Sequence, residues 1–146
     1  MEQRLEGPKL VPKAYKVLVD MEKYLNDCGL ETLERELIKI RASQINQCAY
    51  CLEMHAEDAV KNGESHRRII ALSAWHESPL FSDRERALLA MTEEVTLISE
   101  GGLSEETYQN AREHFSDTQI LEILIQVGQI NVWNRLAISL LQFHPK

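Results

Sequence analysis

The stretch of sequence that most constrains the fold is a long apolar segment that begins at Ser116. Ser116 and Gln119 form a capping-box pattern, in which each side chain can accept a hydrogen bond from a free backbone N–H group of a helix start. The apolar residues that follow are Ile120, Leu121, Ile123, Leu124, Ile125, Val127, Ile130, Val132, Leu136, Ile138, Leu140 and Leu141. They are not confined to one helical face, so the segment is predicted to be a central helix or to lie at a subunit interface. Gly128 in its middle predicts close backbone approach or a bend.

The rest of the chain carries start and stop signals that are typical of helices. Pro12 can begin a helix and Gly29 can end it. Ser82 opens another capping box with Glu85, and Ser104 is a further N-cap candidate. Besides the last helix, we expect helices over about residues 12–28, 31–45, 48–61, 65–73, 82–99 and 104–114. No segment shows sustained alternation of apolar and polar residues, so the fold is predicted to be all-α with about six to seven helices.

Length and charge narrow the class of protein. The 146 residues suit a single domain, residues 1–146, with a sizeable core. The net charge of −7 argues against a nucleic-acid-binding protein. The first eight residues are polar and no run approaches the roughly 18 apolar residues of a membrane span. A cytoplasmic location is therefore expected, and a close cysteine pair there is more often catalytic or metal-binding than structural.

The candidate chemistry lies in a C-x2-C-x3-H pattern formed by Cys48, Cys51 and His55. At about 100° of rotation per residue, the three side chains fall within about 60° of one another on a helix. One helical turn places the two sulfur atoms close enough for a disulfide. If the helix begins at Cys48, its free N–H groups and the positive end of its dipole favour a thiolate.

Two further groups could move the protons that thiol chemistry requires. His55 is one turn from Cys51 and could take the thiol proton or give one to a leaving group. Glu36 lies twelve residues before Cys48, on the preceding helix, and could orient the histidine or act as the base itself. Whether Glu36 reaches His55 depends on how the two helices pack.

Two other interpretations of the cysteine pair remain open at this point. Zinc could be held by Cys48, Cys51 and His55, with Glu36 as a fourth ligand. The pair could also be two inert buried cysteines. No second Cys or His pair at zinc-finger spacing is present, so a redox-active dithiol is favoured, and neither a metal nor another cofactor is expected.

Longer matches point to a known family. The pattern Glu36-x11-Cys48-x2-Cys51-x3-His55 resembles the signature of the alkylhydroperoxidase AhpD-like group within the carboxymuconolactone decarboxylase superfamily. The flanking segments LIKIRASQINQ (37–47), AWHESPLF (74–81) and INVWNRL (130–136) are also similar to single-domain members. The likeness covers about residues 10–142.

The resemblance implies an all-helical AhpD-like domain that assembles as a homo-oligomer, often a trimer or hexamer. It further implies a peroxidase in which Cys51 attacks a small hydroperoxide and Cys48 resolves the resulting sulfenic acid to a disulfide. Glu36 and His55 would form a proton relay. An external dithiol, lipoyl-bearing or from a thioredoxin-like protein, would reduce the disulfide.

The chain departs from the pattern at one position. The best-known peroxidase members carry a histidine where this chain has Tyr50. We therefore retain the alternative of a general thiol-disulfide oxidoreductase without efficient peroxidase turnover. Decarboxylase members generally lack the cysteine pair, which argues against decarboxylation here.

Three polar residues interrupt the apolar C-terminal helix: Asn131, Asn134 and Arg135. They could form hydrogen bonds at a buried interface or near the active site. They could equally lie on the solvent-facing side of that helix. The sequence does not decide between these alternatives.

Overall fold

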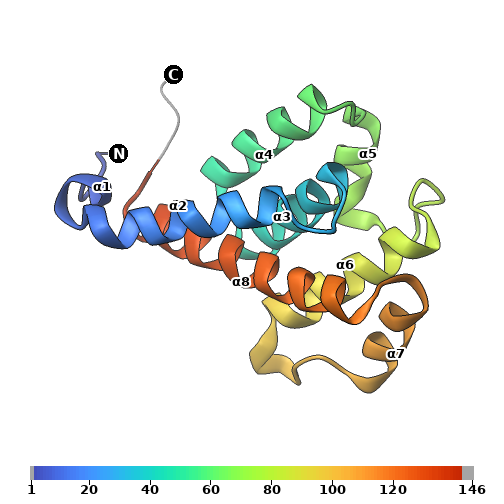
Figure 1. Cartoon of the computed structure of the whole chain (residues 1–146). Coiled ribbons are helices and arrows are strands. Elements are labelled where there is room, and N and C mark those ends of the chain that lie inside the picture. The colour runs from blue at the N-terminus through green and yellow to red at the C-terminus, as the bar shows by residue number, and fades with distance from the viewer. Residues whose placement is uncertain (1, 143–146) are drawn as a thin grey trace.

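Helices account for the regular secondary structure of residues 2–142, the part of the chain that the computed structural model describes (Figure 1). The α-helices are α1 (Gly7–Leu10), α2 (Pro12–Asn26), α3 (Thr32–Asn46), α4 (Ala49–Lys61), α5 (His66–Ala71), α6 (Asp83–Thr96), α7 (Glu105–His114) and α8 (Asp117–Ser139). Two short 3-10 helices, η1 (Leu72–Ala74) and η2 (Ile98–Glu100), follow α5 and α6. No strand occurs between residues 2 and 142, and the all-α prediction is confirmed.

Side-chain caps fix the starts of α6, α7 and α8, as the sequence predicted. The two capping boxes at Ser82 and Ser116 are both formed, and Ser104 accepts a hydrogen bond from the backbone N–H of Thr107 at 3.2 Å. A third capping box, between Glu31 and Glu34, opens α3 and was not anticipated. Each box satisfies backbone donors that would otherwise lack a partner.

One helix was not predicted, and two predicted helices change geometry before their expected ends. The one-turn helix α1 was not predicted, because four residues are too few to show a periodic pattern. The helix expected to reach residue 99 ends at Thr96 and continues as η2, and the helix expected over 65–73 changes to 3-10 geometry after Ala71. These are end effects of the kind that local tightening of a last turn produces.

Helices α3 and α8 lie at the centre of the fold. Helix α3 packs against α4, α6 and α8, and α8 packs against α2, α3, α4, α6 and α7. Figure 1 shows α2 and α8 running alongside each other, with α3 and α4 behind them. Fully buried Ile38 of α3 and Ile123 and Val127 of α8 belong to the same core, which confirms the central position predicted for the last helix.

One face of this central helix nevertheless remains exposed. We define the α2–α8 apolar face as Val17, Met21 and Tyr24 of α2 together with Leu121, Ile125 and Val132 of α8, all of which are exposed. Gly128 lies between the last two, and a Cβ added there would meet nothing within 4 Å, so no other helix of residues 2–142 approaches the backbone closely at Gly128. Between residues 2 and 142, no helix is both long and apolar enough to cross a membrane.

Candidate active site

The cysteine pair sits at the start of α4, as the spacing predicted. Cys48 is the N-cap residue, and its sulfur accepts a hydrogen bond from the backbone N–H of Cys51 at 3.4 Å. The two residues form a disulfide with a Cα–Cα distance of 5.4 Å. Both side chains are almost completely buried. One helical turn therefore suffices to join the two sulfur atoms.

A buried amide network holds the turn that precedes Cys48. Asn46, at the end of α3, donates from Nδ2 to the Oδ1 atoms of Asn131 and Asn134, each at 2.9 Å. Asn134 donates in turn to the hydroxyl of Ser43 at 2.9 Å. The polar residues of α8 thus follow the first of the two alternatives: Asn131 and Asn134 are buried beside the site, while Arg135 is exposed and donates to Asn131.

The same turn requires an unusual backbone conformation. Gln47 ends α3 with a φ of 57°, in the left-handed region that a residue with a side chain adopts at a cost. The backbone N–H of Cys48 then donates to the carbonyl of Ser43 at 3.0 Å. Ser43 thus bonds both to Asn134 and to Cys48, so packing of α3 on α8 fixes the position of the first cysteine.

Glu36 and His55 meet across the α3–α4 interface. His55 Nδ1 lies 3.1 Å from Oε2 of Glu36, and Lys39 Nζ donates to the other carboxylate oxygen, Oε1, at 2.9 Å. All three residues are buried. The structure therefore brings together the two groups whose contact the sequence left open, and it adds a lysine that sequence reasoning missed.

The charge state of Glu36 follows from these contacts. Burial by itself raises the pKa of this carboxyl group, but the hydrogen bond with His55 and the positive charge of Lys39 outweigh it and lower the pKa below the usual 4.5. Glu36 is therefore ionised at neutral pH and accepts the hydrogen bond from His55 Nδ1–H. In the neutral form of the imidazole, this hydrogen bond leaves Nε2 with the lone pair that can accept a proton.

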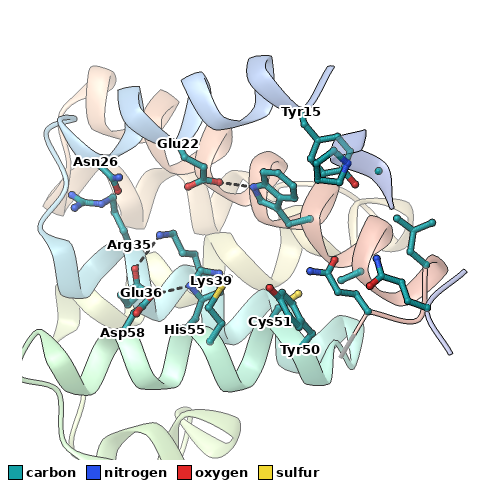
Figure 2. A pocket seen from close by; sticks show the side chains of 18 of the residues that line it. Tyr15, Glu22, Asn26, Arg35, Glu36, Lys39, Tyr50, Cys51, His55 and Asp58 are labelled. Atoms are coloured by element: carbon teal, nitrogen blue, oxygen red, sulfur yellow. Dashed lines mark hydrogen bonds and ion pairs between the residues drawn. The ribbon is translucent and has the colours of Figure 1, made fainter. Parts of the chain in front are cut away.

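Cys51, His55 and Glu36 line one cavity of about 810 Å³ between α2, α3, α4 and α8 (Figure 2). This volume is in the range that holds a small organic molecule. Tyr15 and Trp133 contribute aromatic surface, and the indole N–H of Trp133 donates to Glu22 at 2.7 Å. Cys48 does not line this cavity; it borders a separate depression of about 280 Å³, and Tyr50 lines both.

The residues that sequence reasoning missed are mainly charged residues of α3. Arg35 and Lys39 line the cavity and are buried, although α3 reads as a helix with one apolar stripe and a charged remainder. The available signal was the position of Lys39, three residues after Glu36 and four after Arg35, because residues so spaced are neighbours on a helix face. Among residues 2–142, no group of three or more His, Cys, Asp or Glu side chains is placed to hold a metal ion.

Comparison with known proteins supplies the family. A model of the carboxymuconolactone decarboxylase family matches residues 12–94. The uncharacterized protein YdfG of Bacillus subtilis is 41% identical over 140 residues, which are 96% of this chain and 95% of YdfG. A crystal structure from Agrobacterium tumefaciens, of unknown function and described as a candidate antioxidant defence protein AhpD, superposes with a TM-score of 0.96 at 39% identity and covers 99% of both chains.

A more distant structural match is an enzyme named for a different reaction. The debrominase Bmp8 is 18% identical and superposes with a TM-score of 0.82 over 92% of this chain and 72% of Bmp8, which shows a shared fold alone. The family model and the near full-length relative at 41% identity establish that this chain belongs to the carboxymuconolactone decarboxylase family.

Proposed function

We propose that the protein is an antioxidant enzyme of the dithiol alkylhydroperoxidase type, which reduces hydroperoxides through a Cys48–Cys51 disulfide. The observation that carries this proposal is that Cys51 shares one cavity with the hydrogen-bonded pair of Glu36 and His55. The family suggests an enzyme with an antioxidant or peroxidase-related role, in line with the description of the Agrobacterium tumefaciens structure.

In the first step the reduced Cys51 attacks the peroxide. His55 Nε2 accepts the thiol proton, and the Cys51 thiolate forms a bond to one peroxide oxygen while the O–O bond breaks. The departing alkoxide takes the proton from His55 and leaves as an alcohol. The Glu36 carboxylate stabilises the imidazolium that exists between these transfers.

In the second step Cys48 resolves the oxidised cysteine. Its thiolate attacks the sulfenic acid of Cys51, the S–S bond forms, and hydroxide leaves as water with the proton from the Cys48 thiol. The N-cap position of Cys48 favours the thiolate, because its sulfur accepts the Cys51 backbone N–H. An external dithiol, lipoyl-bearing or thioredoxin-like, then restores both thiols by exchange, and no cofactor takes part.

We also propose that the enzyme works as a homo-oligomer, a trimer or hexamer, in the cytoplasm. The α2–α8 apolar face supports the assembly, because Leu121 is 61% exposed and Val17 is 67% exposed on a surface shared by two packed helices. Exposed apolar surface of this kind is typical of a protein–protein contact.

Tyr50 favours a second candidate, a thiol-disulfide oxidoreductase with slow peroxidase turnover. It lines the cavity beside Cys51 at the position where the resemblance leads us to expect a histidine. A phenol has a pKa near 10 and is a poor proton carrier at neutral pH compared with imidazole. The two candidates differ in the rate of Cys51 oxidation by peroxide and agree on the disulfide.

Counting thiols before and after a stoichiometric pulse of cumene hydroperoxide tests the proposal. The reduced chain has three thiols, and we expect two to disappear per chain. Cys51→Ser should abolish the loss, whereas Cys28→Ser is the matched control and should still lose two, because Cys28 lies outside the disulfide. Survival of all wild-type thiols would contradict the peroxidase.

The role of His55 has its own test. We expect His55→Gln to slow Cys51 oxidation roughly 10²-fold near neutral pH, as loss of a general base typically does. The defect should shrink above the reference thiol pKa of about 8.5, where the thiolate forms unaided. Stopped-flow measurement of thiol loss across this pH range decides the matter. Equal slowing at every pH would mean that His55 does not act by proton transfer.

A further inference from the structure

A buried guanidinium on the cavity wall has no acidic partner. Arg35 is only 6% exposed, and it forms no ion pair with any Asp or Glu in the part of the chain that the structure describes. Its two terminal nitrogens donate to the carbonyl of Leu30 at 2.5 Å and to the hydroxyl of Thr32 at 3.2 Å, both neutral acceptors. Nε has no hydrogen-bond partner among the described residues.

Burial of the Arg35 guanidinium costs free energy unless another group supplies a negative charge. A buried charge is normally paired with an opposite charge, and an isolated one is strongly disfavoured. Among the other buried charged side chains of residues 2–142, Glu34 is paired with Arg84, Glu36 with Lys39 and Glu64 with Arg68, whereas Glu122 forms no ion pair. Arg35 is the buried cation in this part of the chain that has no ion pair.

The neighbouring charges leave the same end of the cavity positive. Lys39 follows Arg35 by one helical turn, so both side chains lie on one face of α3. Glu36 is the carboxylate bonded to Lys39, and it also holds His55. The buried Lys, Arg and Glu side chains at this end are therefore two cations, Arg35 and Lys39, and one carboxylate, Glu36. Figure 2 shows Arg35 and Cys51 toward opposite sides of the labelled site, with Glu36, Lys39 and His55 between them.

We propose that Arg35, assisted by Lys39, is the seat for a carboxylate on the substrate, so that the enzyme acts on organic hydroperoxides that carry a carboxylate group. This inference rests on the proposed peroxidase function and names its substrate class. The carboxylate binds at the Arg35 end, the apolar body lies along Met54 and Trp133, and the peroxide reaches Cys51. Arg donors suit this role, because the guanidinium offers several N–H groups to one carboxylate.

Two acidic side chains also line the wall. Asp58 is drawn beside Glu36 and His55 in Figure 2, and its charge is paired with Lys61 at 3.5 Å. Glu22 accepts the indole N–H of Trp133, and a carboxylate placed against it would meet a like charge. The anionic end of the substrate is therefore directed to Arg35, and the opposite end is left to carry the reacting group.

A binding measurement tests the carboxylate seat without requiring turnover. Titration calorimetry compares para-isopropylbenzoate with its neutral amide, para-isopropylbenzamide, on the full-length protein in its disulfide form. We expect the carboxylate to bind roughly tenfold tighter or more, the value of one charge-assisted hydrogen bond. Equal affinities for the two probes would overturn the proposal, and this comparison needs no variant.

Two variants test whether Arg35 causes the preference for the carboxylate probe. Arg35→Gln should abolish the preference for the carboxylate probe. Arg41→Gln is the matched control, because Arg41 is on the same helix, is paired with Glu93 and does not line the cavity, so it should keep the preference. A preference that survives Arg35→Gln in the folded variant would also overturn the assignment.

Thiol oxidation separates this inference from the proposed function. Cumene hydroperoxide and its para-carboxylate derivative are each mixed with the reduced protein. A lower half-saturating concentration for the carboxylate derivative, lost in Arg35→Gln, supports both proposals. If neither peroxide oxidises the thiols but the calorimetric preference is present, the peroxidase fails and the carboxylate seat stands. If both peroxides react alike and calorimetry shows no preference, the seat fails and the peroxidase stands.

Discussion

Replacing Asn134 with alanine tests whether the amide network holds the cysteine-bearing turn. Asn134 is completely buried in α8. Its side-chain oxygen accepts from Asn46 at 2.9 Å, and its nitrogen donates to the hydroxyl of Ser43 at 2.9 Å. The substitution removes both contacts at once. It leaves Asn46 its second bond, to Asn131, but removes the Asn134 amide that donates to the Ser43 hydroxyl.

The expected loss of stability is about 4 kcal/mol. Each lost hydrogen bond contributes about 1 kcal/mol, and a buried group left unsatisfied adds roughly 1–3 kcal/mol. Ser43 is completely buried, so its hydroxyl cannot turn to bulk water for a partner. The small cavity left by the amide adds to the loss. We therefore expect the free energy of unfolding to fall by roughly 3–5 kcal/mol.

Urea unfolding of the reduced protein, followed by circular dichroism at neutral pH and one fixed protein concentration, measures this change. Fixed concentration matters because an oligomer couples its assembly to its unfolding. Asn110→Ala is the matched control, since Asn110 is an exposed asparagine in α7, and it should change stability by less than about 0.5 kcal/mol.

Two outcomes would refute the reasoning. A loss below about 1 kcal/mol for Asn134→Ala would mean that the network contributes less than one ordinary hydrogen bond. A cycle with Ser43→Ala gives the second outcome: the double variant should lose less than the sum of the single variants, because the two side chains share one bond. Additive losses would show that the Asn134–Ser43 contact is not energetically coupled.

Three further predictions concern the site and the surface. Glu36→Gln should reduce stability at neutral pH, because it leaves Lys39 buried without a counter-charge. Since folding lowers the pKa of Glu36, the stability advantage of the wild-type protein is present above pH 4.5 and should disappear as the pH falls through the lowered pKa. Urea unfolding of both proteins at several pH values measures this difference. Tyr50→His should speed Cys51 oxidation near neutral pH, measured by stopped-flow thiol loss, and an unchanged rate would show that the missing imidazole is not limiting. Ile125→Glu should reduce the mass of the assembly measured by light scattering, and an unchanged mass would remove the α2–α8 apolar face from the interface.

Local sequence determined the helices and the placement of Cys48, Cys51 and His55 on one helical face. Capping boxes at Ser82 and Ser116 act within four residues, and their helices begin where the sequence predicted. The disulfide also follows from local geometry, because one helical turn separates Cys48 and Cys51. Such features depend on backbone sterics and on hydrogen bonds between residues close together in the chain, so a short stretch of sequence is enough to predict them.

Tertiary structure determined which side chains surround these three residues. The contact between Glu36 and His55 exists because α3 and α4 pack with a particular rotation, which neither helix specifies alone. The link from Asn46 to Asn134 joins residues 88 positions apart in the chain. Burial of Arg35 on the cavity wall also arises only in the packed molecule, because on an isolated helix water would solvate its charged side chain. The sequence by itself determined which groups could react, and packing between distant helices determined which charges they face.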